Sequence, residues 1–421
     1  MKRTVKGVWM AFLVVLVLGA APSWGQARVT FTKDVLPIFQ EECQICHRPA
    51  GQNVSGMIAP MSLMTYKEIR PWAKAIAKSV QTRSMPPWTA APEFNGVFKH
   101  ERVMTEDQIA TIVNWVKAGA PRGNPKDAPE PIDWPESGWT IGDGDPDLIV
   151  SFDTPNWVGD EVDDLYQNIT VRVPEKAHPK ERWIKQVEFK PGSEVVHHII
   201  AFQATPTATG AMSAGMIGGE APGTDPTTFP DGYGLLLPKA PVVTFQMHYH
   251  KEAGAGTGVW DESQFAIEFH DKPVTHAIQI ASINHGAFEI PPNNPYWKVG
   301  GAQTFRQDTT ILGFMPHMHL RGIACRYTAF YPDGTSEVLL DVPKYDFNWQ
   351  IFYEYKDQGL KMIPAGTRVE FEMWYDNSPE RGAIGFNSSR PVAFGGPTWD
   401  EMDLGWMNYT PTKPSVSGAD D

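Results

Sequence analysis

From about residue 140 onwards, the sequence alternates short apolar runs with polar residues, and turn signals interrupt it every 8–15 positions. Residues 149–152, 170–173 and 369–373 are such runs, and Pro230-Asp231-Gly232 and Pro332-Asp333-Gly334 are such turns. Alternation with a period of two places every second side chain on one face of a strand. The 37 glycines and 37 prolines suit short strands joined by turns. The pattern predicts two β-sandwich domains in this part of the chain.

The N-terminus has the pattern of a secretory signal peptide. Lys2, Arg3 and Lys6 precede an apolar stretch, residues 8–20, that is too short to span a bilayer core of about 30 Å. Small residues at Ser23 and Gly25 place the expected cleavage after Gly25. An uncleaved anchor is the alternative. We expect a mature protein without a stable membrane span, periplasmic or secreted.

Net charge narrows the classes of partner. The formal charge is -13, and removal of the three basic residues of the signal peptide gives -13 - 3 = -16. Such a surface disfavours nucleic acid and anionic lipid and suits a cationic redox partner.

Residues 43–47 read Cys-Gln-Ile-Cys-His. Two cysteines at this spacing bracket one helical turn, so both reach the same edge of a haem, and the adjacent His47 becomes an iron ligand. A zinc site would need a second pair of ligands nearby, and the sequence has none. The motif predicts one covalent haem c, attached through Cys43 and Cys46 with His47 as the fifth ligand.

The sixth iron ligand is expected some tens of residues further on. Met85 lies in Ser84-Met85-Pro86-Pro87-Trp88, where the prolines fix the backbone and can aim the thioether. A methionine ligand raises the reduction potential. The competing candidates are Met57, Met61, Met64 and His100.

A helix is predicted to begin at Thr105-Glu106-Asp107-Gln108 and to end at Gly119. Apolar residues recur at helical spacing inside it, at Ile109, Ile112, Val113 and Val116. Together with the haem motif, this helix makes residues 30–120 resemble a small cytochrome c domain. Cys325 is left over, so we expect a buried apolar thiol and no disulfide.

Three tight histidine groups indicate metal binding in the β-rich region. They are His197-His198, His248 with His250 two positions on, and His317-Met318-His319. Residues at i and i+2 project from the same face of a strand, so His317 and His319 can meet one ion. His197 and His198 can share an ion only if their strand twists or bulges there.

Four segments carry a family resemblance. They are Val195-Val196-His197-His198-Ile199-Ile200, Phe245-Gln246-Met247-His248-Tyr249, Met315-Pro316-His317-Met318-His319-Leu320 and Asp400-Glu401-Met402. In order and approximate spacing, over about residues 145–412, they resemble the copper type II, ascorbate-dependent monooxygenases, which include peptidylglycine α-hydroxylating monooxygenase and dopamine β-hydroxylase.

The resemblance implies two jelly-roll-like β-sandwiches, each holding one copper, that face each other across an open cleft. His197, His198 and His248 match the ligands of the electron-storing copper. His317, His319 and Met402 match the ligands of the copper that activates dioxygen, where the thioether suits Cu(I). Met373 is the fallback for Met402, and His250 could compete with His248.

The resemblance also bears on the substrate. The arginine that anchors a peptide carboxylate in the amidating enzymes is replaced by Met315, and the asparagine and tyrosine that assist it are replaced by Leu404 and Trp406. We therefore expect a neutral or apolar small organic substrate.

The predicted fold class is multidomain, with a small all-α cytochrome c domain followed by two all-β domains. The predicted boundaries are 1–25 for the signal peptide, 26–128 for the cytochrome c domain, 129–145 for a linker, 146–275 and 276–412 for the two sandwiches, and 413–421 for a tail.

The predicted function is a monooxygenase that hydroxylates a C–H bond with O2. Electrons would come from a periplasmic donor through haem c, from an ascorbate-like donor, or from both. The alternatives are a non-catalytic copper and haem electron-transfer protein and a zinc hydrolase. The sequence has neither a His-Glu-x-x-His helix nor an obvious general base that would support the hydrolase.

Overall fold

The computed structural model describes residues 28–416 apart from 50–58, 60, 135 and 207–211. The predicted signal peptide, Met57 and the last five residues lie outside the described residues.

The first β-body consists of two main sheets around one apolar core. One sheet has the strand order β1-β11-β4-β8-β12, with β7 beside β4, and the other has the order β3-β9-β5-β6. A two-stranded ribbon pairs β2 with β10. The strands are β1 (Leu148–Ser151), β2 (Asn156–Val158), β3 (Asp164–Arg172), β4 (Arg182–Lys190), β5 (Val196–Pro206), β6 (Met212–Glu220), β7 (Thr227–Thr228), β8 (Tyr233–Leu237), β9 (Val242–His250), β10 (Val259–Asp261), β11 (Gln264–Phe269) and β12 (His276–Ala277).

The second β-body has the same plan. One sheet has the order β13-β23-β16-β19, with β20 beside β16, and the other has the order β15-β21-β17-β18. Strand β16 is buried at every position, and its middle part, residues 311–316, is an uninterrupted run without polar side chains. The strands are β13 (Gln279–Ile283), β14 (Glu289–Ile290), β15 (Trp297–Thr304), β16 (Thr309–His317), β17 (Gly322–Phe330), β18 (Ser336–Val342), β19 (Tyr353–Glu354), β20 (Lys361–Ile363), β21 (Arg368–Tyr375), β22 (Val392–Ala393) and β23 (Leu404–Pro411), and the short helix α5 (Pro379–Gly382) precedes β22.

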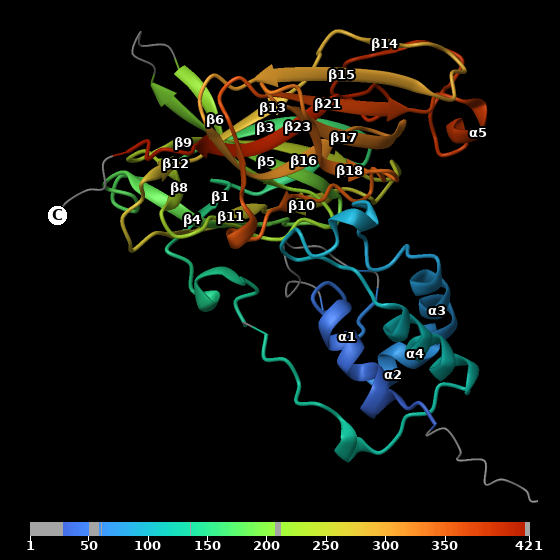
Figure 1. Cartoon of the computed structure of the whole chain (residues 1–421). Helices are drawn as coiled ribbons and strands as arrows, with labels where there is room; N and C mark the ends of the chain where they lie inside the picture. The colour runs from blue at the N-terminus through green and yellow to red at the C-terminus, as the bar shows by residue number, and fades with distance from the viewer. Residues whose placement is uncertain (1–27, 50–58, 60, 135, 207–211, 417–421) are drawn as a thin grey trace, which may run out of the picture.

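The remaining helices lie near the N-terminus (Figure 1). Helix α4 begins with the predicted capping box, in which Thr105 and Gln108 bond each other's backbone N–H groups, and Gly119 follows its end with a positive φ. A separate apolar cluster joins these helices. They are α1 (Leu36–Glu42), which follows a π-helical turn (Phe31–Val35), α2 (Tyr66–Ile69), α3 (Ala73–Gln81) and α4 (Glu106–Lys117).

The predicted fold class needs correction. The structure is mostly β-sheet with only 15% helix, and its described residues form no substantial all-α domain near the N-terminus. The four helices there have 7, 4, 9 and 12 residues. Prolines such as Pro86, Pro87 and Pro92 interrupt helix formation between α3 and α4, because proline cannot donate a backbone hydrogen bond.

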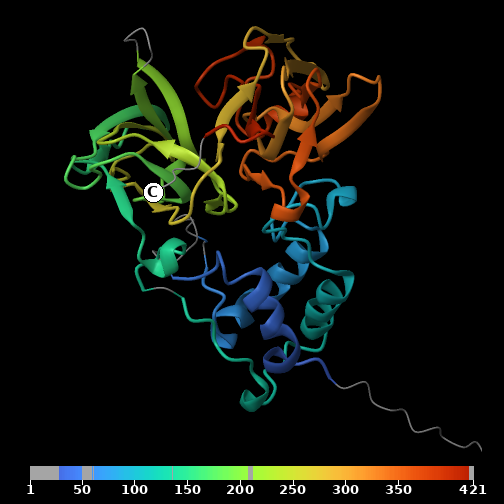
Figure 2. The ribbon, with the colours of Figure 1, turned by 60° about the vertical axis from the view of Figure 1, so that its left-hand side comes forward.

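Part of the N-terminal region packs instead on the second β-body. Ala91, Phe94 and Phe98 belong to the apolar core of that body. Phe98 forms an antiparallel bridge with Tyr355, and the Ala91 amide donates to the Asp341 carbonyl at 2.8 Å. Figure 2 shows the two β-bodies side by side, with the N-terminal helices beneath them. Residues 88–98 therefore hold the helical part against the β-rich part.

The predicted linker also contacts the rest of the chain. The Arg48 guanidinium lies 3.9 Å from the centre of the Trp134 ring, and Trp139 and Ile141 pack on Ala266. None of the helices in the described part of the chain combines the length and the apolar character that a membrane crossing requires.

A buried ion pair at this junction predicts pH-dependent stability. Lys99 lies 3.5 Å from the Glu354 carboxylate and 2.7 Å from that of Asp357. Burial raises the pKa of Glu354 to about 7, against the opposing effect of Lys99. The folded protein thus binds this proton more tightly than the unfolded chain does. The stabilisation that this bound proton gives the folded protein is therefore lost as the pH rises from about 4.5 to about 7.

Glu354→Gln removes this titration. The free energy of unfolding of the variant minus that of the wild type should be about 1–3 kcal/mol more favourable to the variant at pH 8 than at pH 5. Urea unfolding at both pH values measures the change, with exposed Glu93→Gln as the control. An equal stability difference at the two pH values would contradict the prediction.

Candidate functional site

The cysteine–histidine motif lies at the end of α1. Cys43 is the last helical cap, and the His47 amide donates to the Cys43 carbonyl at 2.9 Å. Burial raises the pKa of Cys43 to about 12 and also raises that of Cys46. This is the opposite of what a thiolate metal site or a dithiol redox site requires. The imidazole Nδ1 of His47 donates to the Met61 carbonyl at 3.1 Å, so Nε2 is the nitrogen available to a metal.

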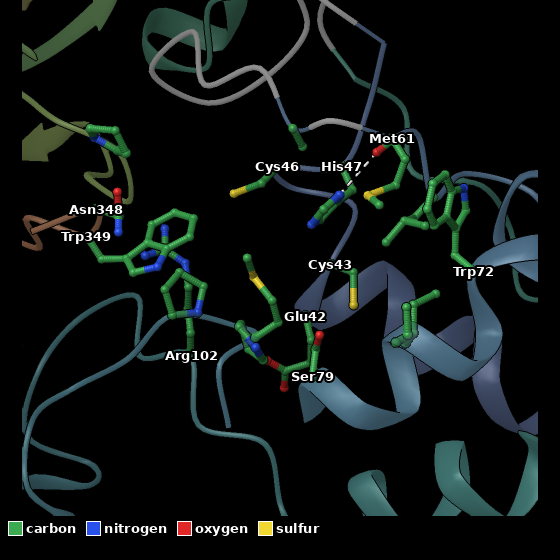
Figure 3. Close-up of a pocket in the computed structure, with 18 of the residues that line it drawn as sticks. Glu42, Cys43, Cys46, His47, Met61, Trp72, Ser79, Arg102, Asn348 and Trp349 are labelled. Carbon is green, nitrogen blue, oxygen red and sulfur yellow. Dashed lines mark hydrogen bonds between the residues drawn. The ribbon is translucent and has the colours of Figure 1, made fainter. Parts of the chain in front are cut away.

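Cys43, Cys46 and His47 border a cavity of about 700 Å³ (Figure 3). That volume lies within the range of cofactor sites, about 300–1,000 Å³. Side chains from the N-terminal helices form one part of the wall and Asn348 and Trp349 of the second β-body another. The wall also includes His197 and Glu220 of the first β-body. The cavity thus extends from the cysteine motif to one of the predicted metal ligands.

The candidates for the sixth iron ligand are placed differently. Met85 and Met61 line the cavity, whereas Met64 and His100 are not among its lining residues, and His100 is exposed. Met61 supplies the carbonyl that fixes His47, so its backbone lies behind that imidazole. Met85 comes from the loop after α3. The axial role of Met85 stays a prediction.

His197, His198 and His248 come together as one potential metal site. The register between β5 and β9 shifts between Val196 and His198, so His197 is the extra residue of a β-bulge. The bulge turns the imidazoles of His197 and His198 to the same side of the strand, so both can reach one ion. His198 Nδ1 lies 3.3 Å from the Nδ1 atoms of both His197 and His248. Two ligands about 2.0 Å from one ion at a tetrahedral angle would be about 3.3 Å apart.

An aspartate that the sequence analysis missed orients this group. His248 Nε2 donates to Asp164 Oδ1, and Thr398 of the second β-body donates its amide to Asp164 Oδ2 at 2.8 Å. Burial opposes ionisation of Asp164, but the bonds from His248 and Thr398 outweigh it and hold the pKa at about 2. A carboxylate behind a ligating histidine fixes its tautomer and raises its basicity. Asp164 starts a strand without any local motif, so only the fold reveals it.

His317 and His319 offer their Nε2 atoms on the other side. His317 Nδ1 donates to Gln350 Oε1 at 2.6 Å, and His319 Nδ1 donates to the Asp400 carbonyl at 3.3 Å. His319 Nε2 is buried and has no hydrogen-bond partner among the described residues. His317 is the last residue of β16, and His319 lies just beyond the strand. Both imidazoles therefore present an unprotonated nitrogen of the kind that binds a metal.

The two histidine groups lie next to each other, which differs from the expected open cleft. The His198 and His317 ring centres are 5.6 Å apart, and those of His317 and His319 are 5.2 Å apart. Phe347 stacks on His197 at 4.4 Å and meets His319 edge-on at 5.9 Å. We call the five residues His197, His198, His248, His317 and His319 the histidine cluster.

Burial keeps the histidine cluster neutral. Burial, followed by the charge of neighbouring histidines, lowers the pKa of His197, His198 and His319 well below the usual value. Burial also lowers the pKa of His317 to about 4 and lowers that of His248 despite the opposing effect of Asp164. Neutral imidazole is the form that binds metal ions.

Met402 follows Glu401 in the chain and lies two positions before the start of β23. The ladder of β16 and β23 ends at the pair of His317 and Leu404, and the Met402 carbonyl accepts a hydrogen bond from the Tyr375 hydroxyl at 2.7 Å. The role of the Met402 thioether as a ligand stays a prediction. The Glu401 carboxylate accepts the backbone N–H groups of His319, at 2.8 Å, and of Arg321, at 2.6 Å. The fallback Met373 is buried in the core of the second β-body, where its sulfur contacts the Tyr375 hydroxyl at 3.5 Å.

The remaining candidates have simpler environments. His250 is exposed at the end of β9 and is not part of the metal group formed by its neighbours. Cys325 is completely buried in an apolar core, as predicted. Met315 pairs with Trp406 across β16 and β23, and both border a small crevice together with Met216 and Ile280. Trp406 Nε1 is buried there without a partner among the described residues.

Comparisons with known proteins do not assign the chain to a family. No family model matches it, and no curated protein matches it. Its similarity to solved structures is weak. The VP2 subviral particle of infectious bursal disease virus matches with 9% identity, 63% of this chain, 72% of that chain and a TM-score of 0.20. PNGF-II matches with 7% identity, 61% of each chain and a TM-score of 0.24. The tandem CBM22 domain of Paenibacillus barcinonensis Xyn10C matches with 9% identity, 64% of this chain, 98% of that chain and a TM-score of 0.14.

The Asp164 contact gives a test of the three-histidine group. Asp164→Asn keeps the size of the side chain but removes its charge, so we expect copper affinity to fall by about 10–100-fold. Competition with a chromophoric Cu(I) chelator measures the affinity. Asp163→Asn, at the exposed neighbouring position, is the control and should bind as the wild type does. Equal affinities in both variants would exclude the proposed role of Asp164.

Proposed function

We propose that this chain is an exported haem c and copper monooxygenase that hydroxylates a C–H bond of a neutral or apolar small molecule with O2. One observation carries the proposal: a single cavity is lined both by Cys43, Cys46 and His47 and by His197 of the histidine cluster. A redox group attached to the cysteines would therefore share its cavity with a proposed copper ligand, His197. The predicted signal peptide supports export, and the acidic composition suits a cationic periplasmic electron donor.

The chain's residues fit both groups. Two thiols and a histidine with a free Nε2 border a cofactor-sized, largely apolar cavity, as covalent haem c requires. Five neutral imidazoles fit copper better than a hard cation, and the thioether of Met402 is the proposed further ligand. When bound, haem c supplies one-electron transfer and copper supplies the activation of O2.

The protein's own contribution is orientation and exclusion of water. Gln350 and the Asp400 carbonyl hold His317 and His319 with Nε2 facing inwards, and Asp164 does the same for Nδ1 of His248. Phe347 covers His197 and His319. In these roles His317, His319 and Met402 would hold the ion for the oxygen chemistry, whereas His197, His198 and His248 would hold the ion that receives electrons.

The proposed substrate class rests on the uncharged side chains of Met315 and Leu404. The crevice beside Met315 and Trp406 has a volume of only about 20 Å³, which is room for about one water molecule and not for an organic substrate. Neither Met315 nor Leu404 offers the charge that a peptide carboxylate requires.

One observation favours a second candidate, a non-catalytic electron-transfer protein. His317 is 4% exposed and His319 is completely buried, so the oxygen-activating group lies inside the protein. Electron transfer tolerates such burial, whereas hydroxylation requires access for a substrate.

A single-turnover experiment separates the two candidates. The copper-loaded protein is reduced without oxygen, mixed with ¹⁸O2 and ethylbenzene, and analysed for labelled alcohol. We expect labelled product from the wild type and from exposed His250→Ala, and none from His317→Ala. Reoxidation of the metals without labelled product from ethylbenzene or from a peptidyl-glycine probe would favour electron transfer. Labelled product from the peptide probe alone would contradict the proposed substrate class.

A further inference from the structure

Glu220 is a buried carboxyl group in the wall of the large cavity. It is the last residue of β6, pairs with Ile199 of β5 and is only 3% exposed. It lines the same cavity as Cys43, Cys46 and His47. Its Oε2 atom has no hydrogen-bond partner among the described residues. An unpartnered buried carboxyl group is costly, so its presence calls for a reason.

Among the described residues, no neighbouring cation compensates Glu220. Arg102 also lines the cavity, but its guanidinium donates to the Gly223 carbonyl at 2.8 Å and to Asp225 at 2.6 Å. His47 and His197 are kept neutral, because burial lowers the pKa of each. Burial alone raises the pKa of Glu220 well above its usual value. In the described structure this group therefore favours its neutral, protonated form.

The other ionisable groups facing the cavity differ from Glu220. Glu42 accepts a hydrogen bond from Gln108 Nε2 at 3.2 Å, and Glu194 is exposed. The two cysteine thiols have raised pKa values through burial and would be consumed by haem attachment. Burial also raises the pKa of Glu42, but among the described acids in this wall Glu220 is the one that combines nearly complete burial with a carboxyl oxygen without a partner.

We propose that Glu220 takes up one proton when a haem held by Cys43, Cys46 and His47 gains one electron. This inference rests on the proposed function. The oxidised centre carries one more positive charge and favours the Glu220 carboxylate. After a one-electron donor has reduced the centre, the carboxylate accepts a proton from solvent to form the carboxylic acid. The net charge of the cavity then stays constant, which matters in a low-dielectric site.

This coupling matches the demand of the proposed reaction. Hydroxylation of RH by O2 to ROH and water consumes two electrons and two protons. A group that binds one proton for each electron entering the cavity brings both in equal number to the side of the protein where His197 lies. Glu220 acts here as a positioning residue for a proton and does not touch the reacting atoms.

Spectroelectrochemical titration of the haem between pH 5 and pH 9 tests the inference. We expect the wild-type midpoint potential to fall as the pH rises, because reduction binds a proton. Glu220→Gln should flatten this dependence. Exposed Glu194→Gln, in the same wall, is the matched control and should retain the wild-type slope.

A second measurement needs no variant. Reduction of the wild-type protein in weakly buffered dye solution should take up about one proton for each haem in the pH range where the potential varies. A covalent haem stain of each sample separates the two proposals. Absence of attached haem would overturn the proposed function and this inference together. Attached haem with equal slopes in the wild type and Glu220→Gln, or with no proton uptake, would overturn this inference alone.

Discussion

Substitution of His198 by alanine should remove copper more effectively than any other single change in the histidine cluster. His198 Nδ1 lies 3.3 Å from the nearest nitrogens of His197 and His248, and its ring centre lies 5.6 Å from that of His317. It is the residue through which the two groups meet. Removing a residue that only orients a metal ligand already lowers metal affinity by about 10–100-fold. Removing the ligand His198 itself should therefore lower copper affinity by more than about 100-fold.

The expected result is loss of copper from His198→Ala after dialysis, with the covalent haem retained. Exposed His250→Ala is the control and should keep the wild-type copper content. Because alanine leaves a cavity, thermal unfolding of the metal-free proteins should accompany the measurement. Full copper content in a folded His198→Ala protein would show that this residue is not a ligand.

Arg321→Ala should destabilise the protein by about 3–5 kcal/mol, the cost typical of breaking a buried charged network. Arg321 is completely buried and its guanidinium lies 3.9 Å from the centre of the Phe386 ring. Its side chain donates to three acceptors, the side-chain oxygen Oδ1 of Asn377 at 2.8 Å, the Trp399 carbonyl at 2.8 Å and the Asn387 carbonyl at 3.4 Å. Truncation would leave these acceptors unpaired and leave Glu401 without its nearby cation.

This change should also disturb the metal site, because Glu401 accepts the His319 amide. Urea unfolding gives the free energy, and copper content gives the effect on the site. Arg326→Ala is the matched control on the same body. Its ion pair with Asp341 is 41% exposed at the arginine, and such pairs contribute less than about 1 kcal/mol. Similar losses of stability in both variants would contradict the assigned role of Arg321.

Local patterns in the sequence predicted local structure well. The alternating runs correspond to strands such as β1, β3 and β21, and the capping residues Thr105 and Gln108 begin α4. The adjacent histidines required a bulge, and the register shift in β5 supplies it. In each case the residues that determine the structure are neighbours along the chain or across one strand pair.

The wrong predictions concern contacts between distant segments. Helical periodicity in residues 106–117 suggested an all-α domain, yet residues 88–98 of the same region pack into a β-sandwich core. An alternating pattern shows which face of a strand is buried and not which element covers that face. The expected open cleft failed for the same reason, because no local pattern indicates that His198 and His317 approach each other.

The supporting residues of the site were missed because they have no motif. Asp164 and Thr398 are 234 positions apart in the sequence and meet at His248. Gln350 and Phe347 lie in the irregular connection between β18 and β19 and contact histidines of both groups. Single polar or aromatic residues of this kind are common in any β-protein, so only their packed positions distinguish them.

The proposed function requires that one chain holds a covalent haem next to the copper ions bound by the histidine cluster. Its most direct test is to measure covalent haem, copper and zinc on the same sample of purified mature protein. We predict one haem and two copper ions for each chain, with zinc absent. Haem without copper, or zinc in place of copper, would contradict the claim and remove the basis for oxygen chemistry.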